Sequence, residues 1–225
     1  MLNEVIFLVH SASIATVSLG LLWLGKEGLT AGVCLFSILS NLLVTKQISL
    51  FGLETIATDV FTIGAVFCLN LLQEYFGKGA TIRAIICNFA LLITYLFMCQ
   101  LHLAYEPSRF DFMQHHFETM LSPMLRITLA SIGSYFLSQL FDSYLYSKLK
   151  ASLHGKHILL RNTITIATSQ LFDTILFTFT ALYGTIHNVW HIIVISYAVK
   201  IIVIICSTPF IALSTFLIRK SQYHE

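Results

Sequence analysis

The sequence predicts an all-α membrane protein, a polytopic transmembrane helical bundle with six or seven spans. Hydrophobic residues make up 56% of the 225 residues and charged residues only 11%, whereas soluble domains carry about 25% charged residues. The mean hydropathy is +0.81, and the apolar runs have the length of about 20 residues that a helix needs to cross a bilayer. We expect residues 1–225 to form one integral membrane domain. Its net charge of +2 is too small to indicate nucleic-acid binding.

Seven apolar runs are the candidate spans. Their approximate bounds are 5–24, 29–46, 57–76, 82–101, 123–147, 162–185 and 190–218. The first run is followed by a turn of only four residues, 25–28, so it is either a full span or a helix at the membrane surface. The N-terminus lacks the basic segment of a signal peptide, so we expect the first run to be retained.

Lysine and arginine residues in the loops predict the orientation, because positively charged loops tend to remain on the cytoplasmic side. One side carries Lys26, Lys78, Arg83, Lys148, Lys150, Lys156, Arg161, Arg219 and Lys220, and the other side carries Lys46, Arg109 and Arg126. Nine against three is a clear bias. The first side is therefore expected to be cytoplasmic, and the C-terminus is cytoplasmic with either number of spans.

A five-residue motif, Ser-Gln-Leu-Phe-Asp, occurs twice inside apolar runs, at 138–142 and at 169–173. A carboxylate within a membrane span costs free energy and indicates a functional site by default. Asp173 and Lys200 each lie about 15 Å from an end of their spans, counting 1.5 Å per residue, which is the middle of the hydrocarbon core. Opposite charges at the same depth lower the free-energy cost of placing each other in the membrane. We therefore expect Asp173 and Lys200 to pair or to share a polar cavity, either as a functional site or as a purely structural ion pair.

Other polar side chains lie in the predicted spans and are candidates for the same site. They are Asn41, Asn70, Glu74, Gln139, Asp142 and Gln170. Asn70 and Glu74 are four residues apart and share a helix face, and Asp142 lies near the depth of Glu74. For the amides, hydrogen bonds between helices are an equally good interpretation. Four charged residues near span ends, Lys46, Asp59, Arg83 and Arg126, either reach the interface or take part in function.

The sequence lacks the motifs of the common membrane enzymes. It has no His-Glu-x-x-His zinc motif, no Gly-x-Ser-x-Gly nucleophile elbow and no Walker A motif. The five cysteines form no Cys-x-x-Cys pair, and the His115-His116 pair has no companion at ligand spacing, so we expect no metal and no cofactor. Polar residues spread over several spans favour translocation over catalysis.

Several stretches in a fixed order resemble one known family. They are Ser40–Lys46, Leu69–Gly77, Ser122–Arg126, Ser138–Lys150, Thr168–Phe177, and Lys200 with Pro209. Over residues 35–218 the chain resembles the queuosine precursor transporters, also called the vitamin uptake transporter family. The resemblance implies import of 7-cyano-7-deazaguanine, its 7-aminomethyl analogue or queuine across the bacterial cytoplasmic (inner) membrane for tRNA modification. Members usually have Asp where this chain has Asn70, which puts transfer of one preferred ligand in doubt.

Such a substrate suggests roles for the polar residues. We expect Asp173 or Asp142 to bind the guanine-like edge, with Gln139, Gln170 and Asn41 assisting, and Lys200 to pair with Asp173 in the empty site. Two alternatives remain: a substrate-binding membrane subunit that relies on a separate ATPase, and an intramembrane enzyme or scaffold. The driving force, facilitated or proton-coupled, stays open. The expected partners are the small-molecule base and membrane lipid, with a homodimer left open.

Overall fold

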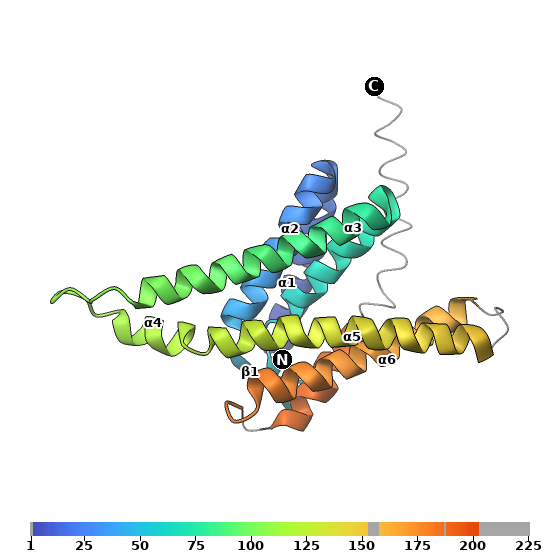
Figure 1. Cartoon of the computed structure of the whole chain (residues 1–225). Helices are drawn as coiled ribbons and strands as arrows, with labels where there is room; N and C mark the ends of the chain where they lie inside the picture. The colour runs from blue at the N-terminus through green and yellow to red at the C-terminus, as the bar shows by residue number, and fades with distance from the viewer. Residues whose placement is uncertain (1, 153–157, 187, 203–225) are drawn as a thin grey trace.

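The computed structural model describes residues 2–152, 158–186 and 188–202 (Figure 1). The elements are α1 (Leu2–Trp23), α2 (Gly25–Leu43), β1 (Gln47–Leu50), β2 (Leu53–Ile56), α3 (Asp59–Leu103), α4 (Gln114–Leu121), α5 (Met124–Ser152), α6 (Ile158–Phe177) and the π-helical turn η1 (Thr178–Leu182). A last helix, Val189–Ile202, is here called the 189–202 helix. The chain is predominantly helical, as the sequence predicts, although one short β-hairpin interrupts the helices.

Four helical segments among the described residues are long and apolar enough to cross a membrane. They are Leu2–Trp23, Asp59–Gly77, Gly79–Leu103 and Gln114–Ser138. The predicted count of six or seven spans is therefore not confirmed. Helices α2 and α6 lie where the spans 29–46 and 162–185 were predicted. The 189–202 helix covers the first half of the predicted span 190–218, and the rest of that prediction lies outside the described residues.

Helix α3 bends sharply at Gly77 (Figure 1). Gly77 has φ 76° and ψ 171°, a conformation that only glycine adopts readily because it has no Cβ atom. The bend separates the segments Asp59–Gly77 and Gly79–Leu103. Two of the predicted spans, 57–76 and 82–101, are thus correctly divided, but the connection between them is a tight glycine bend instead of a loop of several residues.

An antiparallel β-hairpin joins α2 to α3, and the sequence analysis did not predict it. Its register runs from Gln47 opposite Ile56 to Leu50 opposite Leu53. The turn residues Phe51 and Gly52 have φ values of 52° and 78°, as in the tight turns whose twist matches that of the strands. Leu50 is fully buried against the 189–202 helix. The hairpin therefore covers the end of the bundle where α3 begins.

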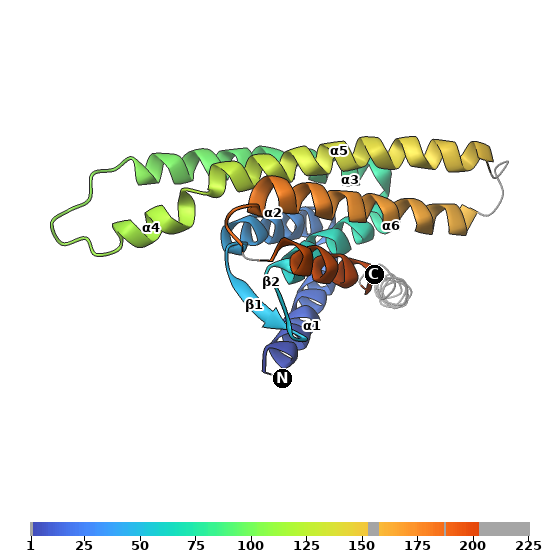
Figure 2. The same cartoon turned by 90° about the horizontal axis from the view of Figure 1, so that it is seen from below.

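Two hydrophobic clusters hold the helices together. The first joins α1 and α2 to the first half of α3 through Leu29, Val33, Cys68, Leu71 and Leu72, among others. The second joins α4, α5 and η1 to the second half of α3. The α2–α3 contact is the most extensive helix pair, followed by α5–α6, and both views show α5 and α6 running alongside each other (Figures 1 and 2).

The end of η1 is held by an arginine from α5. Gly184 has a φ of 85°, so the helical hydrogen bonding stops there and leaves backbone carbonyls without helical partners. Arg126 donates from Nε to the Thr180 carbonyl at 2.8 Å and from Nη2 to the Tyr183 carbonyl at 2.7 Å. Arg126 therefore fixes the end of the α6–η1 segment against α5, in addition to lying near the end of a span.

Candidate functional site

The predicted ion pair between Asp173 and Lys200 is present. Lys200 Nζ on the 189–202 helix donates to Asp173 Oδ2 on α6 at 2.8 Å. The two side chains are 14% and 22% exposed, respectively, for Lys200 and Asp173. Because both side chains are largely buried, the charge on each residue is stabilised mainly by the opposite charge on its partner.

A second carboxylate belongs to the same group of charges. Asp59 is the first residue of α3 and is only 5% exposed. Its Oδ2 accepts a hydrogen bond of 2.8 Å from Ser196 Oγ. Ser196 and Lys200 are four residues apart, so they share one face of the 189–202 helix. We call Asp59, Asp173, Ser196 and Lys200 the charge network.

Asp59 and Ser196 are not among the site residues predicted from the sequence, which left two interpretations open for Asp59: contact with the interface, or a part in function. The structure argues against contact with the interface, because Asp59 is buried and bound to Ser196, 137 residues away. The reason is the β-hairpin, whose Leu50 packs on Ile195 and Val199 and closes this end of the bundle. The available signal was the spacing of Ser196 and Lys200, which puts a hydroxyl one turn from the buried ammonium.

Asn41 carries a buried acceptor in the part of α2 that packs on the start of α3. Its Nδ2 donates to the Ser37 carbonyl at 2.9 Å, while its Oδ1 is buried and has no hydrogen-bond partner among the described residues. The neighbouring Ser40 shares a hydrogen bond of 3.0 Å with Thr62, which lies one turn after Asp59 on α3. This part of α2 therefore lies beside the start of α3, and a buried acceptor such as Asn41 Oδ1 gains free energy from any donor that reaches it.

The other predicted site residues are distributed along the helices. Gln170 is half-buried on α6, one turn before Asp173. On α3, Asn70 is half-buried and Glu74 is exposed, and they follow Asp59 by about 16 and 22 Å at 1.5 Å per residue. The structure therefore does not bring Asn70 and Glu74 to the charge network. Gln139 and Asp142 belong to α5, but their side chains lie outside the part of the chain that is described.

The two copies of the Ser-Gln-Leu-Phe-Asp motif meet where α5 packs on α6. Phe141 and Phe172 contact each other, with ring centroids 4.6 Å apart and ring planes at 31°. Ser138 and Ser169 are buried at 6% and 4% exposure. The repeat thus has a packing role in both copies, and the aromatic pair lies directly beside Asp173 in the sequence.

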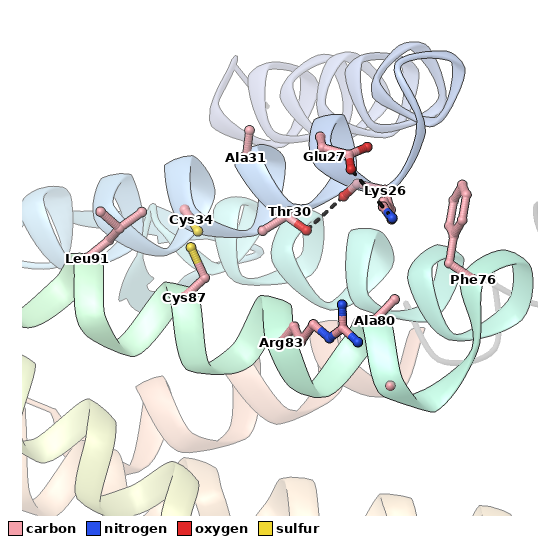
Figure 3. A pocket seen from close by; sticks show the side chains of 11 residues that line it. Lys26, Glu27, Thr30, Ala31, Cys34, Phe76, Ala80, Arg83, Cys87 and Leu91 are labelled. Carbon is pink, nitrogen blue, oxygen red and sulfur yellow. Dashed lines mark hydrogen bonds and ion pairs between the residues drawn. The ribbon is translucent and has the colours of Figure 1, made fainter.

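A separate open cleft of about 860 Å³ lies between α2 and the second half of α3 (Figure 3). Lys26, Glu27 and Arg83 line it together with Thr30, Phe76 and the cysteines Cys34 and Cys87, whose side chains point toward each other (Figure 3). It lies near the start of α2 and the Gly77 bend, where the loops predicted to be cytoplasmic are found. The cleft therefore lies at the Gly77 bend in the middle of α3, whereas Asp59 of the charge network lies at the start of this helix. Among the described residues, no three His, Cys, Asp or Glu side chains converge in a way that would hold a metal ion.

Comparison with known proteins confirms the family predicted from the sequence. A family model described as "Putative vitamin uptake transporter" matches residues 57–214, which include the whole charge network. A protein of Bacillus subtilis (strain 168), named "Probable queuosine precursor transporter", is 33% identical over 189 residues, covering 83% of this chain and 82% of the relative. No solved structure matches the chain. The protein is thus a multi-pass membrane transporter, and it belongs to the vitamin uptake transporter family.

Proposed function

We propose that the protein imports a queuosine precursor, a 7-deazaguanine base, across a bacterial inner membrane into the cytoplasm. The candidate substrates are 7-cyano-7-deazaguanine, 7-aminomethyl-7-deazaguanine and queuine. The name of the Bacillus subtilis relative supports this substrate class. The observation that carries the proposal is the pair of Asp173 and Lys200, a carboxylate held within the bundle on a cation that a ligand can displace.

The chemistry of the base fits this site. A deazaguanine presents a ring N–H and an exocyclic amine next to each other, and the two oxygens of one carboxylate can accept both bonds at once. Asp173 has this geometry available once Lys200 moves away from its Oδ2. The buried Asn41 Oδ1 and the amide of Gln170 offer further polar contacts. A site whose buried polar groups need partners rejects look-alike bases that leave them unpaired.

The distribution of charge supports an inward path. Counting Lys and Arg predicts that the start of α2, the Gly77 bend and the C-terminus are cytoplasmic. Asp59, at the start of α3, is then toward the outer side, and Asp173 and Lys200 are near the middle of the membrane. Substrate arriving from outside reaches Asp173 first and leaves toward the cytoplasmic end of the bundle. Asp142, with Gln139, forms a second level of the same path in this proposal, and residues 1–225 work as one transport domain.

Uptake by living cells tests the proposal. The chain is expressed, without other transport proteins, in bacteria that lack queuosine synthesis and their own importer, and queuosine in tRNA is measured after addition of each base. We expect uptake with the native chain, a loss of at least tenfold for Asp173→Asn, and no change for Glu106→Gln, an exposed carboxylate in the loop before α4. Membrane abundance of each variant is measured in parallel.

Two results contradict the proposal. The first is normal uptake by Asp173→Asn at normal abundance, which would show that the Asp173 carboxylate does not bind the base. The second is the absence of queuosine with all three bases, although the chain reaches the membrane. Uptake that requires an added ATPase would instead identify a substrate-binding subunit. Competition by guanine, measured in the same cells, shows whether the polar edge alone decides recognition.

A further inference from the structure

Lys200 has two carboxylates on its side of the site, and it contacts only one of them. Its Nζ is 2.8 Å from Asp173 Oδ2. Asp59 has no ion pair among the described residues, and its hydrogen bond comes from the hydroxyl of Ser196. Lys200 lies one helical turn beyond Ser196, on the same face of the 189–202 helix. The network thus holds two carboxylates and one ammonium, all at least three-quarters buried.

This arrangement bears on how a substrate reaches Asp173. A base that binds the Asp173 carboxylate must displace the ammonium of Lys200 from it. The displaced ammonium would be unpaired inside the membrane protein, which strongly opposes binding. The cyano base is neutral and the aminomethyl base is a cation at neutral pH, so neither brings a negative charge to replace the one that Lys200 loses. Binding therefore requires another acceptor for Lys200 within the site.

We propose that Lys200 is a switch between two carboxylates: it pairs with Asp173 in the empty site and with Asp59 when a substrate occupies Asp173. This inference rests on the proposed function and adds a positioning residue to it, because Asp59 acts through Lys200 and does not contact the base. The structure shows the first of these two positions.

The geometry makes the second position accessible without a large movement. Ser196 holds Asp59, and Lys200 follows Ser196 by one turn on the same helix face. One turn rises about 5.4 Å, a distance that the flexible four-carbon stem of a lysine can bridge by rotation about its bonds. Ser196 keeps the Asp59 carboxylate turned toward this helix in both positions.

The switch also couples binding to helix movement. In the empty site Lys200 ties the 189–202 helix to α6. With substrate bound, the same side chain ties the 189–202 helix to the start of α3, and α6 is released. A ligand that makes different contacts in two arrangements shifts the balance between them. Substrate binding thereby loosens one helix pair and tightens another, as a transporter that opens alternately to each side requires.

Ligand binding to the full chain in lipid nanodiscs tests the inference, with 7-cyano-7-deazaguanine and 7-aminomethyl-7-deazaguanine as probes. Asp59→Asn keeps the shape and an acceptor for the Ser196 hydroxyl but loses the charge. We expect it to weaken binding at least tenfold while the melting temperature of the empty protein stays within about 2 °C. Asp59→Glu, which restores the charge, should bind within threefold of the native chain. Ser196→Ala, which keeps the charge, should lose less than threefold.

A double-mutant cycle separates an action through Lys200 from direct contact with the base. In a Lys200→Met background the ammonium is gone, so Asp59→Asn should change affinity less than twofold. A tenfold effect in that background would mean that Asp59 contacts the base, and the switch would be wrong. An unchanged affinity of Asp59→Asn in the native background would overturn it as well, and this comparison decides the question even if Lys200→Met does not fold.

The two proposals fail in different ways. If the native chain binds none of the bases, the proposed function fails and the switch fails with it. If the native chain binds a base and Asp173→Asn abolishes binding while Asp59→Asn does not weaken it, the function stands and only the switch is overturned.

Discussion

Replacement of Lys200 by methionine tests the ion pair as a structural element. The change leaves Asp173 buried without its cation, and the volume of the side chain is nearly kept. Loss of one partner from a fully buried pair costs about 3–5 kcal/mol. The side chains are 14% and 22% exposed, so we expect a loss of about 2–4 kcal/mol. For a chain of this size, that loss lowers the melting temperature by about 4–16 °C.

Thermal unfolding in lipid nanodiscs, followed by tryptophan fluorescence or scanning calorimetry, measures this effect without ligand. The double variant Asp173→Asn/Lys200→Met removes both charges and should recover to within about 1 kcal/mol of the native chain. The matched control is Lys26→Gln, because Lys26 pairs with Glu27 at 3.7 Å while the side chains are 58% and 76% exposed. An exposed pair contributes little, so this control should melt within about 2 °C of the native chain. Equal melting temperatures for Lys200→Met and the control would refute the placement of α6 against the 189–202 helix.

Three further changes test other parts of the fold. Arg126→Gln removes two hydrogen bonds to backbone carbonyls at the end of η1; it should cost about 1–3 kcal/mol of stability, and hydrogen exchange after η1 should accelerate. Gly28→Ala places a Cβ atom 2.6 Å from a backbone oxygen at the end of α1 and should destabilise the protein by about 1–3 kcal/mol. In its control, Gly133→Ala on α5, the added Cβ atom meets no atom within 4 Å. In a melting experiment this control should be neutral or stabilising. A mild oxidant should join Cys34 to Cys87, whose side chains face each other across α2 and α3 (Figure 3). Mass spectrometry after alkylation should detect this cross-link in the native chain and lose it when either cysteine is replaced by alanine.

The parts of the fold that were predicted from the sequence depend on local patterns. Apolar runs located α1 and both halves of α3, because a span needs a continuous stretch of the chain. The depths estimated from the number of residues to each span end paired Asp173 with Lys200 correctly. A single charge in the middle of a membrane is very unfavourable, so a pair of opposite charges at that depth is favoured. The β-hairpin escaped prediction because each strand has only four residues, too few to stand out between two longer helical patterns.

Asp59 could not be assigned correctly from local patterns. Its place at the start of a span allows either contact with the interface or a part in function, and the packing of the hairpin on the 189–202 helix closes the end of the bundle around it. Its partner Ser196 is 137 residues away, and a serine in an apolar helix is common enough to carry little information by itself. A site of this kind depends on contacts between distant segments, which periodicity and composition do not report.

The network also shows why α2 contributes to a site made of later segments. The family match begins at residue 57, just before Asp59, and contains all four members of the charge network, whereas α2 precedes it. Yet α2 and α3 form the most extensive helix pair, and Ser40 bonds to Thr62 one turn from Asp59. If Lys200 moves to Asp59, the start of α3 must stay fixed while α6 is released. If Asp59 moved together with Lys200, the new ion pair would not shift the 189–202 helix relative to α3. Helix α2 and the hairpin supply that fixed support, so substitutions that loosen the α2–α3 contact should weaken substrate binding although they remove no charge.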